Sequence, residues 1–159
     1  MCGGGSAGGQ LAAATAMISD PQTNHADDDL KVSCVPNAVI LWNPWFKCEP
    51  KLAPPAHIRS GLPPFLIFCG GQDPGIPVSE MQMFLRSLQA AGVKARLCIG
   101  HKGRHGFCNG RKPRNRFFYW SLTLCDRFLS EQGILTGHAE PVWPQGVSPL
   151  GKEEYEIID

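Results

Sequence analysis

The sequence predicts an α/β fold in which a parallel sheet carries helices on both of its faces. Two continuous apolar runs, residues 38–42 and 65–69, have the length and composition of strands that are buried on both sides. Residues 93–99 give a third strand. Three segments with helical periodicity alternate with these strands: residues 7–18, 78–91 and 116–132.

Local signals mark where these elements start and stop. Residues 7–18 are rich in alanine and begin directly at a glycine loop. Asn-Pro at residues 43–44 ends the first apolar run, and Gly-Gly at residues 70–71 ends the second. A glycine follows each of the two later helices, at Gly92 and Gly133, where it serves as a C-cap.

The composition is that of an ordinary globular domain. Of the 159 residues, 43% are hydrophobic and 18% are charged, and the formal net charge is +1. This charge provides no general attraction to nucleic acid, and no apolar run approaches the roughly 20 residues that span a bilayer. The seven cysteines are odd in number and irregularly spaced, which favours buried free thiols over a disulfide framework.

Both ends of the chain are unusual. The first residues, MCGGGSAGG, open inside a glycine loop and lack the basic start and apolar stretch of a secretory signal. We therefore expect further sequence upstream and assign no compartment. The last segment, residues 136–159, contains three prolines and ends in the acidic EEYEIID, so extended packing on the surface and disorder are both open for it.

Residues 4–8, GGSAG, match the G-x-S-x-G pattern of a nucleophile elbow. In this pattern a serine stands at a tight strand-to-helix turn, and the flanking glycines let the backbone approach without Cβ clashes. We therefore predict that Ser6 is a nucleophile. The N–H of Ala7, at the start of the following helix, is predicted to face a developing oxyanion.

The same glycines also fit the dinucleotide-binding pattern G-x-G-x-x-G, through Gly3, Gly5 and Gly8. That pattern needs an acidic residue about 20 positions later, at the end of a second strand. The aspartates at residues 27–29 lie at the right distance, but in a polar loop with no strand before them. A nucleotide-binding α/β protein and a purely structural turn remain alternatives.

An acid and a base follow the later strands. Asp73 comes just after strand 65–69, and His105 comes just after strand 93–99. Because the carboxyl ends of parallel strands meet at one edge of a sheet, we expect Ser6, Asp73 and His105 to converge there. The chain order Ser–Asp–His is that of a hydrolase triad, in which His105 activates Ser6 and Asp73 orients the imidazole. Such acyl transfer requires no metal and no cofactor.

Three blocks, GGGSAGGQLAAA, LPPFLIFCGGQDPGIPV and RHGFCN, resemble the nucleophile, acid and histidine segments of the α/β-hydrolase family. The branch they resemble is the lipase and esterase group that includes acetyl esterases and carbohydrate esterases. The resemblance covers residues 1–133. It implies that residues 1–135 form the C-terminal part of such a domain, with the N-terminal strands missing, and that residues 136–159 are a tail.

The resemblance also implies a function. The substrate would be a small-molecule or carbohydrate-linked ester, with no nucleic acid partner and no membrane span, and the oligomeric state is left open. The family's HGGG-type oxyanion loop is missing from this sequence. A catalytically inactive truncated fragment or pseudoenzyme is therefore an alternative to an active carboxylic ester hydrolase.

Three further patterns have competing interpretations. Trp42 and Trp45 are predicted to line the substrate pocket, with core or loop packing as the alternative. A C-x2-H-x3-H-x2-C pattern between Cys98 and Cys108 has zinc-like spacing, although strand geometry would point Cys98 into the core. The segment 101–116 is strongly basic. We favour a solvated loop over a nucleic-acid-binding segment, because few aromatic residues are interleaved with the charges. A third interpretation is that the segment attracts an anionic substrate.

Overall fold

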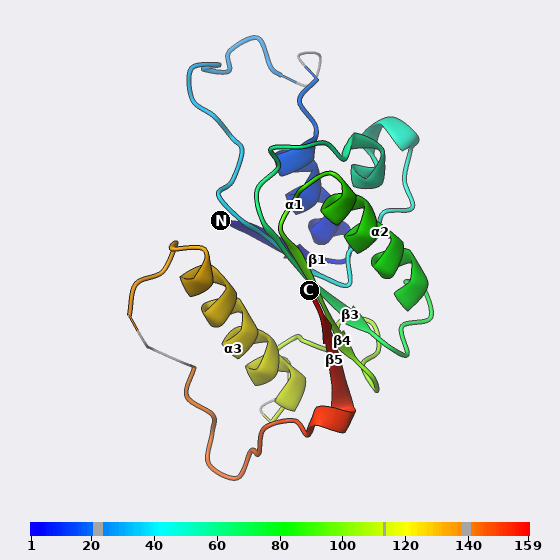
Figure 1. Cartoon of the computed structure of the whole chain (residues 1–159), viewed down its shortest axis with the longest axis vertical. Helices are drawn as coiled ribbons and strands as arrows, with labels where there is room; N and C mark the ends of the chain where they lie inside the picture. The colour runs from blue at the N-terminus through cyan, green and yellow to red at the C-terminus, as the bar shows by residue number, and fades with distance from the viewer. Residues whose placement is uncertain (21–23, 113, 138–140) are drawn as a thin grey trace.

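A computed structural model describes residues 1–20, 24–112, 114–137 and 141–159, and its centre is one five-stranded sheet with the order β1-β2-β3-β4-β5 (Figure 1). The first four strands are parallel, and β5 runs antiparallel to β4. The strands are β1 (Cys2–Gly5), β2 (Val39–Trp42), β3 (Phe65–Gly70), β4 (Ala95–Gly100) and β5 (Tyr155–Ile158).

The helices lie on both sides of this sheet, which confirms the predicted fold class. Helices α1 (Ala7–Met17) and α2 (Val78–Ala90) cover one face, and α3 (Arg116–Glu131) covers the other (Figure 1). Short 3₁₀ helices occur at η2 (Pro50–Leu52), η3 (Pro54–His57) and η4 (Lys152–Glu154). Residues 21–23 of the predicted polar loop, Pro113 of the basic segment and residues 138–140 of the predicted tail lie outside the described residues.

Two apolar cores explain the continuous hydrophobic runs of the central strands. In β2, Val39 and Leu41 pack toward α1 and α2, whereas Ile40 packs toward α3. In β3, Ile67 packs toward the first core and Phe68 toward the second. Because successive side chains of a strand point to opposite faces, a strand covered on both sides must be apolar at every position.

Strand β1 has glycine at three of its four positions. Because glycine is a poor strand former, the sequence predicted a loop there and not a strand. It pairs along its whole length with β2, from Cys2 opposite Val39 to Gly5 opposite Trp42. A Cβ on Gly4 would overlap the carbonyl of Gly8 in α1. Close packing of the strand against the following helix therefore takes priority over strand propensity at this position.

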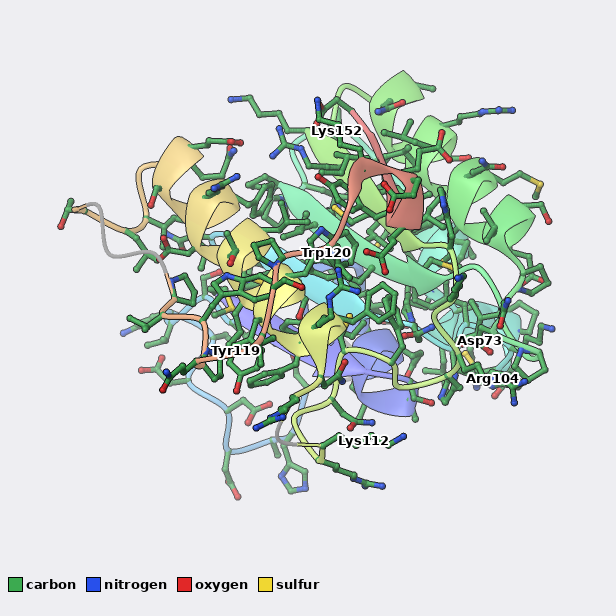
Figure 2. All side chains as sticks on the ribbon, turned by 90° about the horizontal axis from the view of Figure 1, so that it is seen from below. Asp73, Arg104, Lys112, Tyr119, Trp120 and Lys152 are labelled. Carbon is green, nitrogen blue, oxygen red and sulfur yellow. The ribbon has the colours of Figure 1, made fainter. Side chains whose placement is uncertain are left out.

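The end of the chain packs against the domain. Of the two possibilities left open for the tail, the described residues 141–159 adopt the packed one, since they end in β5, the edge strand beside β4. Arg116 at the start of α3 forms an ion pair with Glu154 (2.7 Å), and Trp120 of α3 lies against Tyr155 (5.3 Å between ring centroids). Figure 2 shows Trp120 where α3 meets the C-terminal segment. The proposed division at residue 135 stays a prediction.

All seven cysteines are free thiols, and four of them are buried: Cys69, Cys98, Cys108 and Cys125. Burial, reinforced by the nearby charge of Asp73, raises the pKa of the Cys69 thiol to about 12. A thiol with this pKa is protonated near neutral pH and is a poor nucleophile. In the described part of the chain, no helix is both long and apolar enough to cross a membrane.

Two methionines on α2 provide a matched test of the core. Met81 is 1% exposed beneath the helix, and Met83 is 65% exposed on its outer side. Met81→Ala is expected to lower the free energy of unfolding by about 2–5 kcal/mol because it leaves a cavity in the core. Met83→Ala is expected to change it by less than about 0.5 kcal/mol. Urea unfolding followed by circular dichroism measures both, and equal effects would contradict this packing.

Candidate active site

Ser6 occupies the sharp turn between β1 and α1. Its backbone has φ 56° and ψ −123°, a region that costs a non-glycine residue about 1–3 kcal/mol. The turn is held by hydrogen bonds from the Ser6 N–H to the Trp42 carbonyl (3.0 Å) and from the Trp45 N–H to the Ser6 carbonyl (3.0 Å). Gly9 packs on Pro44, so that a Cβ there would lie 3.0 Å from the proline. Neighbouring segments thus hold the serine in a strained but defined position.

Asp73 and His105 lie on two loops whose backbones are in direct contact at several glycines. The N–H of Gln72 donates to the Gly103 carbonyl (2.8 Å), and the N–H of Gly71 donates to the Gly100 carbonyl (2.8 Å). A Cβ on Gly70 would come within 2.5 Å of the Gly103 carbonyl oxygen. Only residues without a side chain permit this approach, so the loop after β3 is held directly against the loop after β4.

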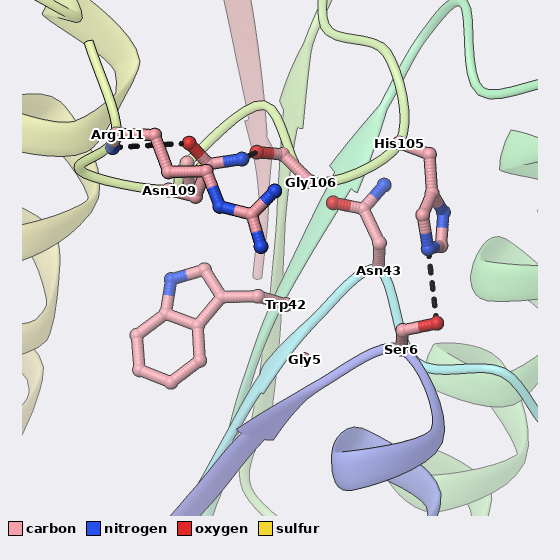
Figure 3. Close-up of a pocket in the computed structure, with 9 residues that line it drawn as sticks. Gly5, Ser6, Trp42, Asn43, His105, Gly106, Asn109 and Arg111 are labelled. Atoms are coloured by element: carbon pink, nitrogen blue, oxygen red, sulfur yellow. Dashed lines mark hydrogen bonds between the residues drawn. The ribbon is translucent and has the colours of Figure 1, made fainter.

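The three predicted residues form a continuous chain of hydrogen bonds. His105 Nδ1 lies 2.8 Å from Asp73 Oδ2. The second link, shown in Figure 3, joins His105 Nε2 to Ser6 Oγ at 2.9 Å. An ionised carboxylate has no proton to donate, so Nδ1 carries the hydrogen and Nε2 accepts from the serine hydroxyl. The structure therefore brings together side chains that are up to 99 positions apart in the sequence; their catalytic roles stay predictions.

The carboxylate of Asp73 is surrounded by donors. Its Oδ1 accepts hydrogen bonds from the N–H groups of Gly75 (2.9 Å) and Ile76 (3.2 Å), and its Oδ2 accepts from Asn43 Nδ2 (2.8 Å) as well as from His105. Burial by itself acts to raise the pKa of Asp73, but the hydrogen bonds and the interaction with His105 outweigh it and lower the pKa. The group is thereby kept ionised beside the imidazole.

Asn43 is a site residue that sequence reasoning missed. It follows β2, is 1% exposed, and adopts a left-handed backbone with φ 47°. Its N–H donates to the Phe68 carbonyl (2.8 Å), and its side chain turns toward Asp73. Asparagine tolerates this backbone better than most residues. Its position at the end of a buried strand, on the same edge as Asp73, was a signal that the sequence contained.

The predicted oxyanion and pocket residues lie around Ser6. Ala7 is the first residue of α1, so its N–H has no partner within the helix. Trp42 lines a cavity of about 480 Å³ on one side of Ser6 and His105, and stacks on Phe68. Trp45 lines a second cavity of about 400 Å³ on the other side. Both tryptophans therefore border the space beside the serine hydroxyl, and their contact with substrate stays a prediction.

The described residues do not have the arrangement that a zinc site or a nucleotide site of the predicted kind would need. Cys98 and Cys108 are buried in the core beneath α3, and His101 Nδ1 lies 2.8 Å from the Glu153 carbonyl oxygen. Within the described ranges, no three histidine, cysteine or acidic side chains gather closely enough to hold a metal ion. The described residues 24–35 also contain no strand that would present an acidic residue to a ribose.

The sheet, its flanking helices and the site at the carboxyl ends of its parallel strands together make a partial α/β-hydrolase fold. Among solved structures, the chain is similar to Thermogutta terrifontis esterase 2 phosphorylated by paraoxon, with 34% identity over 86% of this chain and 55% of that chain, and a TM-score of 0.78. The propionate-bound form of this esterase gives 32% identity over 86% and 57% of the two chains, with a TM-score of 0.78. The native form gives 31% identity over 91% and 56%, with a TM-score of 0.76.

These similarities support the α/β-hydrolase esterase family for this chain. The chain spans a little over half the length of the esterase chains that it matches. No protein-family model matches the chain, and neither does any curated protein.

The contact between Asn43 and Asp73 is tested with Asn43→Gly, which keeps a left-handed backbone accessible and removes only the side chain. Loss of a hydrogen bond to a charged group is expected to lower the free energy of unfolding by about 1–3 kcal/mol and to raise the pKa of Asp73. NMR titration of the Asp73 carboxyl carbon and urea unfolding measure the two effects. Asn37→Gly, at an exposed position just before β2, is the control. An Asp73 pKa that does not move in Asn43→Gly would contradict the assigned contact.

The lowered pKa of Asp73 also predicts a pH dependence of stability. Because the pKa is lower in the folded chain than its unfolded value of about 3.9, ionised Asp73 stabilises the fold above that pH. This stabilisation is lost as the pH falls through the folded value. Urea unfolding from pH 6 to pH 3 is expected to show a stability difference between the natural chain and Asp73→Asn that shrinks below about pH 4. A difference that stays constant over this range would contradict it.

Proposed function

We propose that this chain carries the catalytic site of a serine hydrolase that cleaves carboxylic esters. The observation that carries the proposal is the hydrogen-bonded chain from Ser6 Oγ through His105 to Asp73, with 2.9 Å and 2.8 Å at its two links. This arrangement couples a hydroxyl to a neutral imidazole that is oriented by a buried carboxylate, which is what activation of a serine near neutral pH requires.

In the proposed reaction, Ser6 Oγ attacks the ester carbonyl while His105 Nε2 takes its proton. The alcohol leaves with a proton from His105, and an acyl group stays on Ser6. Water, activated by the same imidazole, then releases the acid. Asp73 stays ionised and stabilises the imidazolium that forms in both steps, and the N–H of Ala7 donates to the oxyanion.

The relatives support this chemistry. One form of the Thermogutta esterase is phosphorylated by paraoxon, and others have propionate or butyrate bound. By analogy, we propose that this site accepts esters with short acyl chains. The acetyl-esterase or carbohydrate-esterase branch is the finer proposal, and it rests on the sequence resemblance alone.

A catalytically inactive fragment is the second candidate, because the chain covers only 55% of the esterase chain it matches. In the resembled family, one oxyanion donor comes from a loop that this sequence lacks. Loss of one such donor slows acyl transfer by roughly 10²–10³. The active hydrolase and the inactive fragment therefore share the same Ser6 turn and differ in the rate of acyl transfer.

Reaction of Ser6 with a fluorophosphonate probe tests the proposal directly. We expect covalent labelling of the full chain at Ser6, identified by mass spectrometry of the labelled peptide, because the probe reacts with serines that a histidine activates. Ser6→Ala is expected to abolish labelling, whereas Ser130→Ala, on α3, is expected to leave it unchanged. Absence of labelling in a chain that melts cooperatively would favour the inactive candidate.

Turnover of 4-nitrophenyl butyrate tests the roles of the other two residues. Asp73→Asn is expected to lower kcat by about 10⁴, since the imidazole loses its orienting carboxylate, and His105→Ala by a similar or larger factor. His57→Ala is a matched histidine control, because His57 instead contacts the Lys51 carbonyl (2.8 Å). If Asp73→Asn retained most of the kcat, the proposed role of Asp73 would be wrong.

A further inference from the structure

The cavity of about 480 Å³ beside Ser6 contains a basic side chain that the proposed reaction does not use. Besides Ser6 and His105, it is lined by Trp42, Asn109 and Arg111. In Figure 3 the Arg111 guanidinium extends from its loop toward the space between Trp42 and Asn43. A cation therefore borders the same cavity as the reacting hydroxyl.

Hydrogen bonds hold the loop that carries Arg111. The Arg111 N–H donates to Asn109 Oδ1 (3.2 Å), and Asn109 Nδ2 donates to the Gly106 carbonyl (2.5 Å). Asn115, the N-cap of α3, donates through Nδ2 to the carbonyls of Phe107 and Asn109, each at 2.7 Å. The backbone of Arg111 is thus tied to His105's own loop and to the start of α3.

Among the described residues, no ion pair neutralises the charge of Arg111. Residues 101–116 contain six lysines and arginines and no acidic residue. Arg116 is paired with Glu154, but no carboxylate of the described residues lies within 4.0 Å of the Arg111 guanidinium. Because the net charge of the whole chain is only +1, the six basic residues make a local excess of positive charge in the segment that contains His105.

We propose that the site selects esters that carry a carboxylate, and that Arg111 binds this carboxylate while Ser6 attacks the ester carbonyl. This inference rests on the proposed function and specifies its substrate class. A guanidinium matches a carboxylate through two parallel N–H···O bonds, and a single arginine suits a single negative charge. The Trp42 ring, held by stacking on Phe68 at 5.8 Å, provides an apolar wall for the carbon chain between the two groups.

Matched ester pairs test the proposal in the full chain. 4-Nitrophenyl hemiglutarate has a carboxylate on the acyl side, and 4-nitrophenyl pentanoate is its neutral partner. 4-Acetoxybenzoate has the carboxylate on the alcohol side, and methyl 4-acetoxybenzoate is its neutral partner. For at least one pair, Arg111→Gln is expected to lower kcat/KM of the anionic ester about tenfold or more, which is the usual loss for a hydrogen bond to a charged group. The neutral partner is expected to change less than twofold.

Arg114→Gln is the matched control, since it removes the same charge from the same loop outside the cavity. It is expected to change kcat/KM of the anionic esters only slightly and only at low salt, as long-range attraction is screened. Equal losses in Arg111→Gln and Arg114→Gln, or equal losses for anionic and neutral esters, would overturn the proposal while leaving the hydrolase intact. If no ester is cleaved and Ser6 takes up no fluorophosphonate, the proposed function itself fails, and this inference fails with it.

Discussion

The hydrogen bond between His105 Nδ1 and the buried carboxylate of Asp73 is the interaction on which the rest of the site depends. It requires the loops after β3 and β4 to approach to within van der Waals contact of their backbones. Gly70 and Gly71 make this approach possible, because a Cβ at either position would clash with a facing carbonyl oxygen, at 2.5 and 2.6 Å. The parallel sheet then brings both loops to the edge where Ser6 stands.

Asp73 shows how the fold supports one charge. A carboxylate taken out of water is costly unless donors replace the lost hydration. Here two backbone N–H groups, Asn43 and His105 supply those donors, and the net result is a lowered pKa despite burial. The same contacts restrict the carboxylate in orientation, so that the imidazole is held with Nε2 toward Ser6. Stability and the geometry of the proposed catalytic site are therefore coupled at this residue.

Two observations support different parts of the proposed function. The similarity to an esterase concerns the reaction, and the charge of the 101–116 segment concerns the choice of substrate. Identity of 31–34% to the Thermogutta esterase, together with the shared fold, supports ester hydrolysis in general. The ligand that the site prefers depends instead on side chains around the serine. Trp42 and Arg111 on one side, and Trp45 on the other, give the two cavities an apolar wall and, in the larger one, a positive charge.

Sequence patterns were enough to predict three strands and three helices, with boundaries within two residues of those observed, and to single out Ser6, Asp73 and His105. These features are encoded locally, in hydrophobic period, in glycine and proline stops, and in the positions of polar residues after strands. Contacts in the folded chain, and not local patterns, make the glycine-rich segment 2–5 a strand and put residues 155–158 at the edge of the sheet. They also bring Asn43 to Asp73 and Arg111 to the cavity beside Ser6. Each of these depends on contacts between segments far apart in the chain, and no local pattern specifies which distant surface a residue will meet.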